Sequence, residues 1–288
     1  MIKTVIFKLE GVILSQDLLL FKYYQILWSY LRVQPEWKDF SQLIKLRNLL
    51  MQRNGESEIY LNIARRYLSQ PDFERYQLEI KLFRQKHSAS YLHIIPGIRS
   101  IIQSTSYYYK NALFTHQKAL LKLVRKDYKL NNLFSFIIPP DMVRDMEYDA
   151  GFFQKILEQT RSNPSETVMV SDRSDAEMSS AQKLGIYTIS ANFDITTRGI
   201  SPQSSDEREY FTLPEKRISH QPSLLIRRVT AHAVAKKPRD ILLIIEALEA
   251  GEKPPRQEEQ PQAEKQYTLA DLLREAFAPQ FKNDRKSD

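Results

Sequence analysis

A stretch at the start of the chain constrains its fold more than any other. Residues 4–9 have the pattern of a strand, and residues 5–7 are all β-branched or aromatic. This pattern predicts a central parallel strand that is covered on both faces. Two charged residues, Lys8 and Glu10, follow at its carboxyl end, and Gly11 ends it. Because ligands bind at the carboxyl ends of strands in open α/β sheets, we expect these charges to lie where a site would form.

The composition is that of an ordinary globular protein. The chain has 288 residues, of which 42% are hydrophobic and 27% charged, enough for a sizeable core. It contains no apolar run of about 18 residues, so we expect no membrane span. It contains no cysteine, which excludes disulfides and thiolate metal sites and favours a cytoplasmic location.

The net charge of +7 raises the question of a nucleic-acid partner. Basic residues are frequent in a predicted helix over residues 117–128, where they alternate with leucine and valine. This spacing favours the solvated face of an amphipathic helix. Nucleic-acid binding is the alternative, and we do not favour it because no known motif accompanies the charge.

Strands and helices alternate along most of the chain. Apolar residues at helical spacing predict helices over 17–31, 41–51, 56–68 and 71–86. Short apolar runs then predict further strands, which are 111–116, 134–138, 167–170 and 187–189. The pattern indicates an α/β fold with a parallel sheet and an all-helical insertion after the first strand.

Four segments, in chain order, resemble the motifs of the haloacid dehalogenase (HAD) superfamily of phosphotransferases. Residues 7–11, Phe-Lys-Leu-Glu-Gly, are similar to its first motif, Phe-Asp-x-Asp-Gly. Thr115 stands where the second motif carries a hydroxyl residue. Residues 147–153 resemble the third motif, and residues 171–177 resemble the fourth. The resemblance covers roughly residues 1–195.

This resemblance implies a domain organisation. A Rossmann-like core with a parallel sheet is expected over residues 1–14 and 92–195. An all-helical cap is expected over residues 15–91, as in the subclass that places its cap directly after the first motif. In that subclass the cap closes over the active site and selects the substrate.

The matched motifs depart from the family pattern at the positions that carry its chemistry. The family's first Asp is the nucleophile, and here that position is Lys8. Glu10 takes the position of the general acid/base, and Glu147 takes the position of the third-motif lysine. The fourth motif keeps Asp172, with Glu177 as its second acid; Asp175 is the alternative if the register shifts. The degenerate motif positions are therefore Lys8, Glu10, Thr115, Glu147, Asp172 and Glu177.

Lys8 removes what the family's reaction needs. Active members hold Mg²⁺ with carboxylates, whereas an ammonium has three donors and no acceptor. At about 4 Å, two like unit charges repel by about 4 kcal/mol at an effective dielectric of about 20, and Mg²⁺ is divalent. We therefore expect no metal and no catalytic residue, with Lys8 within hydrogen-bond reach of Asp172 or Glu147 in place of Mg²⁺. The pairing with Glu147 depends on the register of the third motif, which is open.

The last third of the chain departs from the family pattern. We expect a C-terminal extension over 196–251, irregular up to about residue 221 and with a helix near 239–250. Residues 252–288 read as a disordered tether that carries a short amphipathic helix, 268–278. Its apolar face contains Leu269, Leu272, Leu273 and Phe277. This helix either docks in a partner's groove or folds back on its own domain.

The sequence thus predicts a catalytically inactive HAD-like protein that acts as a binding, scaffolding or regulatory factor through protein–protein contacts, without a cofactor. Two alternatives remain. One is a phosphatase-type hydrolase with a non-standard site that uses Glu10, Asp172 or Glu177, together with Mg²⁺. The other is a sensor that binds a phosphorylated metabolite, with Lys8 and Thr115 favouring the anion.

Overall fold

A parallel sheet with β1 (Thr4–Lys8) at its centre organises the structure, a computed structural model. The structure describes residues 1–54, 59–115, 117, 120–121, 124, 128–138, 150–172, 176–211 and 231–252. Within these residues the chain divides into two compact units. One unit contains the sheet and is formed by the described residues of 1–18, 89–201 and 231–252. The other unit is helical and is formed by the described residues of 19–88 and 202–211.

Six strands of the described chain form the sheet, in the spatial order β5-β4-β1-β6-β7-β8. Besides β1, the sheet contains β4 (Lys110–Phe114), β5 (Phe136–Ile138), β6 (Thr167–Ser171), β7 (Tyr187–Ala191) and β8 (Ala233–Ala235). All pair in parallel. The order of strand addition reverses beside β1, so the switch point lies between β1 and β6.

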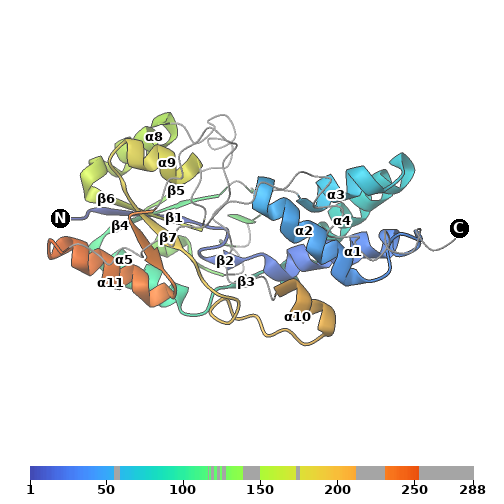
Figure 1. The fold of residues 1–288 in the computed structure, drawn as a ribbon. Helices are drawn as coiled ribbons and strands as arrows, with labels where there is room; N and C mark the ends of the chain where they lie inside the picture. The colour runs from blue at the N-terminus through green and yellow to red at the C-terminus, as the bar shows by residue number, and fades with distance from the viewer. Residues whose placement is uncertain are drawn as a thin grey trace, which may run out of the picture. The chain divides into compact units, whose positions relative to one another are not determined.

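Helices cover both faces of the sheet (Figure 1). On one face lie α5 (Ile98–Tyr108) and α11 (Pro238–Glu249), and on the other lie α8 (Ala150–Thr160) and α9 (Ala176–Lys183). All five residues of β1 are buried, which confirms the prediction of a strand covered on both faces. The core under α8 and α9 contains Ile6, Ala112, Phe114, Ile138, Phe152, Phe153, Ile156, Leu157, Met169, Ala181 and Ile186.

The helical insertion has the predicted elements. Its helices are α1 (Asp17–Leu31), α2 (Phe40–Asn54), α3 (Ile59–Tyr67) and α4 (Gln70–Tyr91). The prediction for α4 ended five residues early, at 86 rather than 91. A two-stranded antiparallel ladder flanks the insertion and belongs to the sheet-containing unit. It pairs β2 (Leu14–Ser15) with β3 (His93–Ile94).

The extension is partly different from the prediction. Residues 205–211 form a helix, α10 (Ser205–Phe211), so the expectation of an irregular segment was wrong there. The sequence around Tyr210 and Phe211 is polar, and these two rings are buried in contact with residues that are distant in the sequence, such as Phe21. The helix expected near 239–250 is confirmed as α11, and β8 before it adds an edge strand that was not expected. The predicted helix at 268–278 lies outside the described residues.

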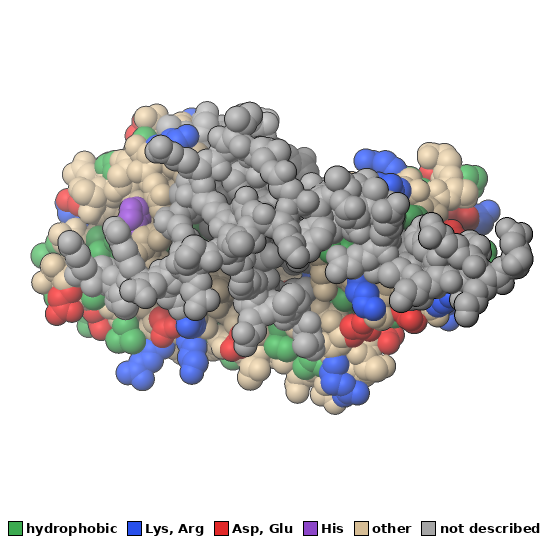
Figure 2. Space-filling model, viewed as in Figure 1, with side chains coloured by type: hydrophobic (Ala, Val, Ile, Leu, Met, Phe, Trp, Pro, Cys, Tyr) green, Lys and Arg blue, Asp and Glu red, His purple; other side chains and the backbone are tan. Residues whose placement is uncertain are grey.

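The described part of the chain contains no helix that is long and apolar enough to cross a membrane. On the face seen in Figure 2, the described basic and acidic side chains are interspersed, and no broad patch of either sign is visible among them. The basic residues of the predicted helix over 117–128 lie outside the described residues, apart from Lys129 that follows it.

Candidate functional site at the carboxyl ends of the strands

Three neighbouring strands bring polar side chains together at one edge of the sheet. Lys8 is the last residue of β1, Thr115 directly follows β4, and Ser171 ends β6. The register places Lys8 beside Phe114 and Phe7 beside Val170, so the three strand ends are adjacent. This is the switch point of the sheet, where parallel α/β folds form their ligand sites.

Lys8 is the buried centre of an ion-pair cluster. Its side chain is only 2% exposed, and its Nζ lies 3.0 Å from Asp172 Oδ1 and 3.0 Å from Glu177 Oε1. The expected contact with Asp172 is thereby confirmed, while Glu147 lies outside the described residues. Two carboxylates around one ammonium compensate the charge that burial would otherwise leave without a partner.

Glu177 is fixed by a second hydrogen bond that the sequence reasoning missed. Ser171 Oγ donates to Glu177 Oε2 at 2.8 Å, and Glu177 is 1% exposed. Glu177 also lies in the first turn of α9, where the helix dipole favours a carboxylate. The spacing of Ser171 and Glu177 in the sequence is the one signal that could have suggested this contact.

The turn after β1 packs directly against this cluster. Gly11 has a φ of +73°, and a Cβ added to it would lie 1.9 Å from Asp172 Oδ2. A side chain at this position is therefore excluded twice, by the backbone conformation and by the carboxylate. Close approach of Gly11 leaves Asp172 little room to turn away from Lys8.

A second buried carboxyl lies beside the ion pairs. Thr115 Oγ1 donates to Glu10 Oε1 at 2.5 Å, and the Gln117 backbone N–H donates to Thr115 Oγ1 at 3.1 Å. Glu10 Oε2 is buried and has no hydrogen-bond partner among the described residues. Burial raises the pKa of Glu10 above its ordinary value of 4.5, against the opposing effects of Lys8 and the Thr115 hydrogen bond.

These residues do not fit a divalent metal ion. The two acids that could ligate it, Asp172 and Glu177, both form ion pairs with the Lys8 ammonium, which itself offers no acceptor. Among the described residues no group of three or more His, Asp or Glu side chains is arranged to hold a metal. The donor set is that of an internal ion pair and not of a Mg²⁺ site.

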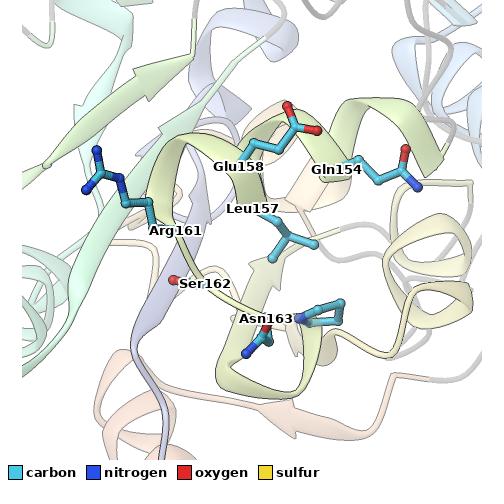
Figure 3. Close-up of a pocket in the computed structure, with 7 residues that line it drawn as sticks. Gln154, Leu157, Glu158, Arg161, Ser162 and Asn163 are labelled. Atoms are coloured by element: carbon cyan, nitrogen blue, oxygen red, sulfur yellow. The ribbon is translucent and has the colours of Figure 1, made fainter.

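A shallow depression of about 560 Å³ lies elsewhere on the same unit (Figure 3). It is formed by the last turns of α8 and the 3₁₀ turn η2 (Pro164–Glu166) that precedes β6. Its lining residues are Gln154, Leu157, Glu158, Arg161, Ser162, Asn163 and Pro164. Because η2 leads into the start of β6, this depression lies at the opposite end of the strands from Lys8 and shares no residue with the cluster.

The comparisons with known proteins agree with this architecture. The model of the haloacid dehalogenase-like hydrolase family matches residues 5–191. No curated protein matches the chain. Among solved structures, a HAD-superfamily hydrolase of subfamily IA, variant 1, from Geobacter sulfurreducens PCA has a TM-score of 0.57 at 16% identity, covering 85% of this chain and 96% of its own.

Two further solved structures are similar. A predicted phosphoglycolate phosphatase from Haemophilus somnus 129pt has a TM-score of 0.54 at 13% identity, covering 85% of this chain and 98% of its own. A haloacid dehalogenase-like family hydrolase from Streptococcus pneumoniae has a TM-score of 0.52 at 14% identity, covering 85% and 98%. At these identities the likeness concerns the fold alone.

The ion-pair cluster predicts a large difference between two lysines. In Lys8→Met the carboxylates of Asp172 and Glu177 face each other without a cation, so the free energy of unfolding should fall by about 3–5 kcal/mol. The matched control is Lys3→Met, which removes an exposed ammonium that pairs with Glu166 at 2.6 Å and should change stability by less than about 1 kcal/mol. Urea unfolding at pH 7 measures both, and equal losses would contradict the role of Lys8.

The raised pKa of Glu10 predicts that the free energy of unfolding depends on pH. Because its pKa is raised in the folded state, the native protein binds more protons than the unfolded chain as pH rises above about 4.5, and its stability falls through that window. Glu10→Gln keeps the shape but cannot ionise, so this fall should be missing from its stability curve. The exposed Glu158→Gln serves as control. Parallel curves for Glu10→Gln and the unaltered chain between pH 4.5 and 8 would refute the assignment.

Proposed function

The chain belongs to the haloacid dehalogenase-like hydrolase family, and from this premise we propose that it is a non-catalytic member that acts by binding a protein partner. The buried ion pair of Lys8 carries this proposal. The family's phosphoryl transfer uses a carboxylate nucleophile and a bound Mg²⁺. The ion pair of Lys8 supports the proposal that this chain has lost both.

The nucleophile is the first of these. Family resemblance assigns that role to the position of Lys8, whose ammonium forms ion pairs with Asp172 and Glu177. A protonated amine has no electron pair with which to attack phosphorus. The two carboxylates that surround it stabilise this charged form.

The metal is the second. A divalent cation placed between Asp172 and Glu177 would meet the Lys8 ammonium within a few ångströms, where like charges repel strongly in a site shielded from water. Lys8 is 2% exposed, so its ammonium is held inside the cluster with its two carboxylate partners. We therefore derive no catalytic step through a metal at this site.

A binding role accords with the parts of the chain that the family model does not cover. Residues beyond 191 supply α10, β8 and α11, which enlarge both units. We propose that a protein partner contacts this extension, including the apolar residues Leu269, Leu272, Leu273 and Phe277 in the part outside the described residues. We propose a cytoplasmic location, since the chain has no cysteine.

One observation favours a second candidate function, a hydrolase with a non-standard site. Glu10 is buried, has a raised pKa and keeps one carboxyl oxygen without a partner among the described residues. A carboxyl of this kind can hold a proton for general acid catalysis. Thr115 beside it offers a hydroxyl. In this candidate Glu10 acts on a substrate that needs no carboxylate nucleophile.

An assay with an aryl phosphate separates the two candidates. We expect no turnover above the uncatalysed rate with or without Mg²⁺, and no effect of Mg²⁺ on the melting temperature. Lys8→Asp replaces the ammonium by a carboxylate, so Mg²⁺ should raise the melting temperature of this variant. Turnover by the unaltered chain that disappears in Glu10→Gln would establish the hydrolase and overturn the non-catalytic proposal.

Partner binding has its own test. The full chain and a Leu272→Ser/Phe277→Ser variant are each used to capture proteins from native extract. We expect a protein that co-purifies with the unaltered chain in fixed proportion to be lost with the variant, because the apolar face of the helix is interrupted. An Asp271→Ser variant, altered on the polar side, is the control. If neither variant changes what is captured, the tail does not provide the contact.

A further inference from the structure

Helix α4 presents a pair of leucines to solvent. Among the described residues of the helical unit, the exposed large apolar side chains are Val33, Leu78 and Leu82. Leu78 is 55% exposed and Leu82 is 43% exposed, and both belong to α4. Because they are four residues apart, they lie next to each other on one side of the helix. Single exposed leucines are ordinary on a protein surface, whereas an adjacent pair indicates a surface that makes a contact.

The opposite side of α4 is the one that packs inside the unit. Its buried residues are Phe73, Tyr76 and Ile80, at the spacing of three and four residues that is typical of a core-facing stripe. The Tyr76 hydroxyl also donates to the Tyr23 carbonyl of α1 at 3.3 Å. Leu78 lies midway between Tyr76 and Ile80 in the sequence, so its side chain points away from this stripe. The leucine pair therefore lies outside the core of the helical unit.

Charged side chains divide α4 into two halves of opposite sign. Residues 70–79 contain three acids and one base, whereas residues 80–88 contain three bases and no acid. The charged residues of the first half are Asp72, Glu74, Arg75 and Glu79, and those of the second half are Lys81, Arg84 and Lys86; all of them except Asp72 are exposed. A helix dipole favours this order only in the first and last turns. The change of sign between positions 79 and 81 lies in the middle of the helix, beside the leucine pair.

We propose that this side of α4 is a docking surface for a second copy of the chain. The two helices lie antiparallel about a two-fold axis at the level of Ile80. A two-fold contact uses the same patch on both copies, so the patch must complement itself. In the antiparallel arrangement each acidic half faces a basic half, and the leucines of both copies meet at the centre. A parallel arrangement would place like charges opposite each other, which is unfavourable.

The size of the patch sets the strength of the contact. A helix of 22 residues is about 33 Å long. One pair of such helices buries less than the roughly 1,200 Å² of total surface at the lower limit for stable complexes. The dimer therefore forms reversibly, with a dissociation constant in the micromolar range.

This inference goes beyond the proposed function and does not depend on it. The docking surface shares no residue with the ion-pair cluster of Lys8 or with the apolar residues proposed to bind a protein partner. A dimer through α4 is compatible with a binding protein or with a hydrolase. The experiment below measures the oligomeric state, so its failure is distinguishable from failure of the proposed function.

Sedimentation velocity of the full chain at increasing concentration measures the association. The unaltered chain should change from monomer to dimer as its concentration passes through the micromolar range. Leu78→Ser/Leu82→Ser should raise the dissociation constant by about tenfold or more, because the dimer loses four leucines from its centre. The matched control is Leu243→Ser in α11, which alters a leucine that is 49% exposed in the other unit and should leave the dissociation constant unchanged. A chain that stays monomeric at every concentration would overturn the proposal.

Charge reversal tests the antiparallel arrangement. In Glu74→Lys/Glu79→Lys both halves are basic, and in Lys81→Glu/Lys86→Glu both are acidic, so each variant alone should be monomeric. A mixture of the two should form a heterodimer, with a dissociation constant at least about tenfold lower than for either variant alone. Glu79 also accepts an exposed hydrogen bond from Tyr30 at 2.9 Å, so the melting temperature of each variant checks its folding. A mixture of folded variants that does not associate would contradict the antiparallel contact.

Discussion

The buried ammonium of Lys8 is the charge around which the strand ends are arranged. Removing an ammonium from water is unfavourable by several kcal/mol, so a lysine at the end of a central strand requires close partners. Asp172 and Glu177 provide them at 3.0 Å each. Other features of the site follow from this arrangement. Ser171 fixes the far oxygen of Glu177, and Gly11 leaves space for Asp172. The protein thereby holds an ammonium of its own chain at the place where the resemblance to its family implies a metal ion.

The cluster contains more acid than base among the described residues. Lys8 has two carboxylate partners, and Glu10 lies close enough for both Lys8 and Glu177 to influence its pKa. Burial dominates that influence and favours the neutral carboxyl. A proton on Glu10 reduces the negative charge beside Glu177. A lysine of the chain itself therefore offsets part of the carboxylate charge, where metal-dependent sites of carboxylates use a cation from solution.

Much of the fold could be predicted because it depends on local patterns. The apolar block of residues 5–7 determined a central strand, and helical spacing determined four helices of the insertion. In the extension the same kind of pattern predicted α11 but not α10 or β8. The helix α10 is polar apart from Tyr210 and Phe211, and β8 is only three residues long. Such elements form because a distant surface covers them, and a local window contains no information about that surface.

The sequence by itself determined which chemical groups stand at the strand ends. Lys8 follows a central strand and Asp172 follows another, and a parallel sheet must bring such ends to one edge. Only the tertiary structure decided how these groups pair. The partners of Glu177 and Arg198, which are Lys8 and Asp17, are far away in the sequence. Ser171 is closer to its partner Glu177 in the sequence, but only the folded chain decides whether their side chains point toward each other. The reason is physical: the residue type fixes charge and hydrogen-bonding capacity, whereas burial and distance, which set the strength of each interaction, exist only in the folded chain.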